Sequence, residues 1–63
     1  MTYEELISRP VDLLEGLAAI YNHEGYVLWS KYKDDSRMSE QAYKSRLAET
    51  IWNAMPDYAK TKS

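Results

Sequence analysis

The chain has 63 residues, of which 44% are hydrophobic and 29% are charged, with a formal net charge of −2 and no cysteine. This length allows one domain at most, and a folded chain of this size buries only about 60% of the surface that it exposes when unfolded. The composition is typical of a folded globular chain, and the absence of cysteine excludes disulfide bonds and thiolate metal sites.

The apolar runs are far shorter than the roughly 20 residues that a membrane-spanning helix needs. Met1 is followed by acidic residues rather than by the basic start of a signal peptide. We therefore expect a soluble, cytoplasmic protein without membrane contact. The charges are unevenly distributed, since residues 1–30 carry five acids and one base, whereas residues 31–63 carry seven bases and five acids. The excess of bases over acids in residues 31–63 is small. It argues against a strongly basic protein that binds the phosphate backbone of nucleic acid.

The first predicted element is a short helix over about residues 3–8, which begins after Thr2. The order Thr2-Tyr3-Glu4-Glu5 matches a capping box, in which the threonine hydroxyl and the glutamate carboxylate each accept from a backbone amide at the helix start. We expect this helix to cover one end of the core.

A second helix is predicted from Pro10, because proline fits the first helical turn, where an amide hydrogen is not needed. Gly16 lies off its apolar stripe and costs about 1 kcal/mol relative to alanine, so it either marks a close backbone approach or has no structural role. The stripe is about 120° wide and consists of Leu13, Leu14, Leu17, Ile20 and Tyr21.

The joint at His23-Glu24-Gly25 allows three interpretations of residues 23–33: a continuation of the preceding helix, a separate helix, or a strand. A continuous helix would place Glu24 and Lys31 inside the apolar stripe, whereas a break with Gly25 as C-cap avoids this. A strand over residues 26–32 would have no second strand to pair with. The prediction is a separate helix over about residues 26–33.

After a polar linker at residues 33–38, the segment Ser39–Met55 is predicted as the longest well-defined helix. Ser39 is a good N-cap, Glu40 suits the positive end of the helix, and Pro56 prevents continuation. The apolar side chains cover about half of the helix circumference, which is too wide for one neighbouring helix. We therefore expect this helix to lie between two neighbours, either within the chain or in a partner.

These elements predict an all-α fold, in which residues 10–33 pack as an antiparallel helical hairpin against residues 39–55. With the N-terminal turn this gives a domain of three to four helices over residues 1–58, followed by a flexible tail at residues 59–63. Two hairpins pairing into a four-helix bundle would cover the wide apolar arc, so a homodimer is the expected oligomer.

No catalytic or cofactor motif accompanies this fold, and we expect neither enzymatic activity, a cofactor, a metal nor a small-molecule substrate. His23 is the only histidine, and a zinc site needs three or four converging ligands. The six serines lack a glycine-flanked nucleophile elbow. Two glycines, Gly16 and Gly25, are too few for a phosphate-cradling loop or a dinucleotide fingerprint.

The six tyrosines and two tryptophans, with no phenylalanine, combine apolar bodies with polar tips, which suits a surface that becomes dry when a partner binds. The sequence therefore predicts a small helical regulator that binds a larger protein or itself. Trp52 lies at the margin of the wide arc, about 180° from Tyr43, so one of the two must contact something other than the main helical neighbour. The predicted interface residues are Trp29, Tyr43, Leu47, Ile51, Trp52 and Met55.

The alternative is a helix-turn-helix-like regulator that binds nucleic acid through residues 26–33 and 40–55. A six-residue linker is longer than the usual turn of such a unit, and nearby acids weaken the positive field. Its predicted contacts are Lys31, Lys33, Arg37, Lys44 and Arg46.

Overall fold

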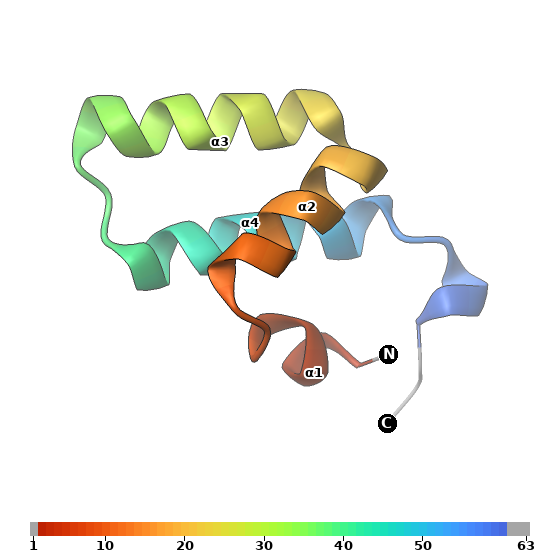
Figure 1. Cartoon of the computed structure of the whole chain (residues 1–63). Coiled ribbons are helices and arrows are strands. Elements are labelled where there is room, and N and C mark those ends of the chain that lie inside the picture. Colours follow the sequence, from red (N-terminus) through yellow and green to blue (C-terminus); the bar gives the residue numbers. More distant parts are fainter. Residues whose placement is uncertain (1, 61–63) are drawn as a thin grey trace.

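The computed structural model describes residues 2–60 of the chain, and this part contains helices and turns but no strand. The all-α fold is therefore confirmed, and the strand considered for residues 26–32 is excluded because these residues lie inside a helix. The elements, shown in Figure 1, are α1 (Tyr3–Ile7), α2 (Val11–Tyr21), α3 (His23–Ser36), α4 (Glu40–Ala54) and the 3-10 helix η1 (Asp57–Ala59).

Two of the predicted helix starts are formed by the expected caps. The Thr2 hydroxyl accepts a hydrogen bond from the Glu5 amide at 3.2 Å, and the Ser39 hydroxyl accepts from the Ala42 amide at the same distance. Each bond satisfies an amide that has no partner within its helix. Pro10 precedes α2 as its N-cap residue rather than lying in the first turn.

The joint between α2 and α3 lies at Asn22, so the prediction of Gly25 as C-cap is wrong. The Asn22 amide donates to the Ala18 carbonyl at 2.8 Å, while its side-chain oxygen accepts from the Gly25 amide at 3.1 Å. One residue therefore ends α2 and starts α3, because its short polar side chain can cap a helix. Helix α3 consequently begins three residues earlier than predicted and includes Gly25 in its first turn.

Helix α4 forms the centre of the fold, since it contacts α1, α2 and α3. Figure 1 shows α3 and α4 running in opposite directions, with α2 packed beside both and α1 at the far side of α4. Residues 10–33 are thus not one straight arm but two helices that fold against each other. The buried core consists of Leu6, Leu14, Ala18, Tyr43, Leu47, Ala48, Ile51 and Met55.

The chain after α4 returns to the core. Ala59 packs against the buried cluster, and the Lys60 ammonium lies 5.3 Å from the centre of the Trp52 ring. The predicted flexible tail, residues 59–63, therefore begins with two packed residues, and residues 61–63 lie outside the described part of the chain.

The two glycines have opposite surroundings. A Cβ atom built on Gly25 would lie 2.7 Å from the Thr50 methyl carbon and 3.0 Å from the Asn22 side-chain nitrogen, whereas one built on Gly16 would meet nothing within 4 Å. Glycine at position 25 lets α3 approach α4 closely. The close approach suggested for Gly16 is not present.

We expect Gly25→Ala to destabilise the fold by about 1–3 kcal/mol, because overpacking outweighs the better helix propensity of alanine. Gly16→Ala, the matched control, should stabilise it by about 0.5–1 kcal/mol. Urea unfolding followed by circular dichroism measures both changes. On a Thr50→Ser background, which removes the methyl group but retains a hydroxyl, the cost of Gly25→Ala should shrink; an unchanged cost would show that the Thr50 contact is not its cause.

Candidate functional site

Four of the six predicted interface residues lie inside the chain. Tyr43, Leu47 and Ile51 are fully buried, and Met55 is 5% exposed. The wide apolar arc of α4 is covered by α1, α2 and α3 of the same chain, so these side chains cannot form an exposed interface. The prediction is corrected at these four positions. The arc did require more than one neighbour, as expected, and the chain itself provides them.

Tyr43 is held between two helices. Its hydroxyl donates a 2.8 Å hydrogen bond to a carboxylate oxygen of Glu15 in α2, and the Lys33 ammonium of α3 lies 4.7 Å from its ring centre. Burial, followed by the hydrogen bond and the negative charge of Glu15, raises the pKa of Tyr43 above its usual value. The phenol therefore keeps its proton and joins α2 to α4 as a structural group.

The two tryptophans are half-buried, and each contacts a different part of the chain. Trp52 packs edge-on against the ring of Tyr3 in α1, with 5.8 Å between ring centres. Trp29 packs edge-on against Tyr32 at 5.6 Å, and the Arg46 guanidinium lies 5.4 Å from its ring centre. Either Trp52 or Tyr43 was expected to contact something other than the main helical neighbour of α4. Trp52 makes that contact, with Tyr3 of α1 and with Lys60 after α4.

The basic residues predicted for nucleic-acid binding have separate environments. Lys33 lies against Tyr43, Arg46 lies against Trp29 and 3.8 Å from the Glu49 carboxylate, and Arg37 adopts a left-handed conformation (φ 55°) at the end of α3.

The connection between α3 and α4 is short, but Figure 1 shows an antiparallel hairpin, whereas the helices of a helix-turn-helix unit meet at about 90–120°. The described arrangement therefore gives the nucleic-acid hypothesis no support.

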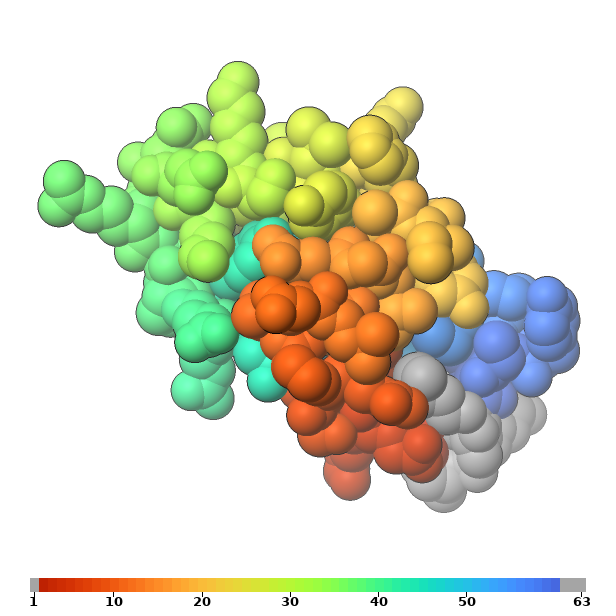
Figure 2. Space-filling model, in the orientation of Figure 1, coloured from red at the N-terminus to blue at the C-terminus, as the bar shows by residue number. Residues whose placement is uncertain are grey.

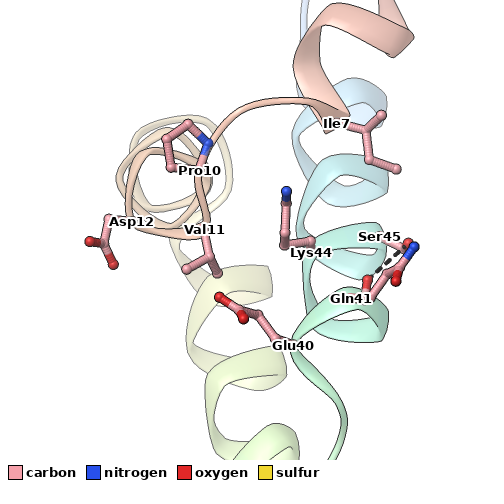
Figure 3. A pocket seen from close by; sticks show the side chains of 8 residues that line it. All are labelled: Ile7, Pro10, Val11, Asp12, Glu40, Gln41, Lys44 and Ser45. Atoms are coloured by element: carbon pink, nitrogen blue, oxygen red, sulfur yellow. Dashed lines mark hydrogen bonds between the residues drawn. The ribbon is translucent and has the colours of Figure 1, made fainter.

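A hollow of about 580 Å³ lies between the start of α2 and the start of α4 (Figure 3). Its lining mixes apolar side chains with Lys44 and the carboxylates of Asp12 and Glu40. In Figure 3 Lys44 projects between Pro10 and Ile7, while Asp12 points away from it. The polar groups do not converge on one point, as they do in a site that orients a small ligand.

Several exposed apolar side chains lie on α3 and at the end of α2, two elements that lie side by side in Figure 2. Ile20 is 78% exposed and Leu28 is 61% exposed, and Val27 and Tyr32 are also exposed. Val27 and Leu28 line a shallow hollow of about 500 Å³ together with His23, Glu24 and Lys31. This five-residue surface, the α3 outer face, points away from the core.

The α3 outer face was missing from the predicted interface. The sequence prediction placed the break at Gly25 instead of Asn22, so Glu24 fell outside the predicted helix over residues 26–33. The sequence does contain a signal for this face, because Val27 and Leu28 lie between the charged residues Glu24 and Lys31. The two charged residues are seven positions apart and therefore lie on one line along a helix.

Comparison with protein-family models, curated proteins and solved structures gave no match for this chain. Residues 2–60 contain neither a helix long and apolar enough to cross a membrane nor a group of three potential metal ligands among histidine, aspartate and glutamate. The α3 outer face is thus the feature from which a function can be argued.

Proposed function

We propose that this protein is a small non-enzymatic interaction module, and that it binds another folded protein through the α3 outer face. The observation that carries this proposal is the exposure of Val27 and Leu28 in a shallow hollow that Glu24 and Lys31 also line. An apolar centre with a polar rim is the usual composition of a protein interface.

The energetics favour covering this face. Fully burying a leucine side chain contributes about 1.5–3 kcal/mol, and Leu28 gains little of this within its own chain because it is mostly exposed. Tyr32 is half exposed beside it and held edge-on by Trp29, so it offers a large ring that is already partly ordered. Such pre-ordered aromatic side chains lose little conformational entropy on binding.

The titratable pair in the interior does not suggest a catalytic role. Tyr43 is fully buried and its hydroxyl is occupied by Glu15, so a substrate has no access to the phenol. A general acid or base must reach the atom that it serves. The pair is better explained as a link between α2 and α4.

We expect Leu28→Asp to weaken binding of the cellular partner about 10- to 100-fold, because a charge replaces an apolar side chain of the hollow. The matched control is Leu13→Asp, an exposed leucine of α2 outside the hollow. Tagged wild-type and variant chains are used for affinity isolation from the cells that make the protein. Proteins retained by wild type and Leu13→Asp should be lost with Leu28→Asp. Equal retention by a Leu28→Asp variant with wild-type circular dichroism would contradict the proposal.

A further inference from the structure

We propose that the partner on the α3 outer face is a second copy of this chain, packed so that the two α3 helices run antiparallel about a two-fold axis between Val27 and Leu28. This inference rests on the proposed function, and it identifies the occupant of the same surface. Four exposed side chains of α3 make this surface complementary to itself: Glu24, Val27, Leu28 and Lys31.

The four residues form a compact pattern. At about 100° per residue, Glu24 and Lys31 lie within about 20° of the same line down the helix, and Val27 and Leu28 lie on either side of that line between them. All four are exposed and line one hollow. The face therefore has an acid at one end, a base at the other end and apolar side chains in the middle.

The two charges cannot satisfy each other within the chain. Seven residues correspond to about 10 Å along a helix, which is beyond the 4 Å of an ion pair. Among the described residues, the ion pair found joins Arg46 and Glu49, and neither Glu24 nor Lys31 takes part in one. Both charges are available for a partner.

An antiparallel second copy matches this pattern. A two-fold axis midway between Val27 and Leu28 relates positions at equal distances on its two sides, so Glu24 of one copy faces Lys31 of the other, twice. Val27 and Leu28 lie on opposite sides of the Glu24–Lys31 line, so across this axis Val27 packs against Val27 of the second copy and Leu28 packs against Leu28. The face is thus complementary to itself, which is the requirement for a two-fold symmetric interface.

A parallel arrangement of the two α3 helices does not bring opposite charges together. It would place Glu24 next to Glu24 and Lys31 next to Lys31, and like charges at an interface oppose association. The charges therefore select the antiparallel direction, and the apolar centre supplies the attraction.

The expected dimer is weak. Helix α3 has 14 residues and is therefore about 21 Å long, and one helix face of this length buries less than the roughly 800 Å² per partner of a standard stable interface. We expect a dissociation constant between about 1 μM and 1 mM.

The test is sedimentation equilibrium of the purified full chain up to about 1 mM. Wild type should dimerise, and Glu24→Lys or Lys31→Glu alone should weaken dimerisation about tenfold or more, because each creates two like-charge pairs. The double variant Glu24→Lys/Lys31→Glu should restore it. An equimolar mixture of the two single variants should form a heterodimer, because each acid again meets a base.

Three outcomes would overturn the second copy as partner: a monomeric wild type at about 1 mM, single variants that dimerise like wild type, or a mixture that remains monomeric. Circular dichroism of each variant verifies that it is folded. If the pure protein is monomeric while the partner isolated from cells still depends on Leu28, the proposed function stands and only self-association fails. If neither self-association nor a Leu28-dependent partner is found, both proposals fail.

Discussion

Leu47→Ala is expected to lower the free energy of unfolding by about 2–5 kcal/mol. Leu47 is fully buried in α4, and α4 is the helix that contacts the other three. Truncation removes buried apolar contacts and leaves a cavity that a close-packed core fills only partly. Folded domains gain about 0.05–0.15 kcal/mol per residue, so a chain of 63 residues has about 3–9 kcal/mol in total. The variant should therefore unfold at a much lower urea concentration than wild type, and it should be unfolded at room temperature if the wild type lies at the low end of this range.

The control for this prediction is Leu13→Ala, which truncates the same side chain at an exposed site in α2. Its effect should stay within about 1 kcal/mol, since surface substitutions rarely cost more. Urea unfolding monitored by circular dichroism measures the variants and the wild type under identical conditions. Similar losses for Leu47→Ala and Leu13→Ala would show that the core is not where the structure places it.

The free energy of unfolding is also expected to fall as the pH rises above about 10, the pKa of tyrosine in an unfolded chain. Burial and the neighbouring Glu15 raise the pKa of Tyr43 in the folded state, so folded Tyr43 keeps a proton that the unfolded chain loses. Stability from this group is complete below about pH 10 and decreases by up to about 1.4 kcal/mol per pH unit above it. The decrease continues until the pH reaches the raised pKa of the folded state.

Tyr43→Phe isolates this effect, because phenylalanine retains the ring but cannot ionise. At neutral pH it should cost about 1 kcal/mol, the usual contribution of one hydrogen bond. Between pH 9 and pH 11 it should lose less stability than wild type. Urea midpoints measured across that range provide the comparison. Identical pH dependence of both proteins would mean that Tyr43 ionises in the fold as easily as in the unfolded chain.

The best-predicted part of the fold was α4, because its signals are local. Ser39 caps its first turn, Pro56 follows its end, and the wide apolar arc required several neighbours. The sequence prediction placed the joint between α2 and α3 at the wrong residue, because asparagine and glycine are both common at helix ends. Gly25 lies where α3 approaches Thr50 of α4, and a contact with a residue so distant in sequence has no local signal.

The candidate site was harder to predict than the fold. The arc of α4 shows that Tyr43 and Trp52 need different neighbours, but periodicity within one helix does not say whether the neighbour belongs to the same chain. Tyr43 is fully buried by α2 and α3, whereas Trp52 remains half-buried against α1. Because helices of the same chain cover the apolar arc of α4, the exposed apolar side chains of α3 are the better candidate for a partner-binding surface.

Helix α4 contacts the other three helices and holds the fold together, whereas the α3 outer face is exposed. The most direct test is the free energy of unfolding of Leu28→Asp, measured by urea denaturation at a concentration low enough to keep the chain monomeric. A free face predicts a value within about 1 kcal/mol of wild type, which covers the lower helix propensity of aspartate and the small buried part of Leu28. A loss of about 2 kcal/mol or more, as for a buried leucine, would contradict the claim.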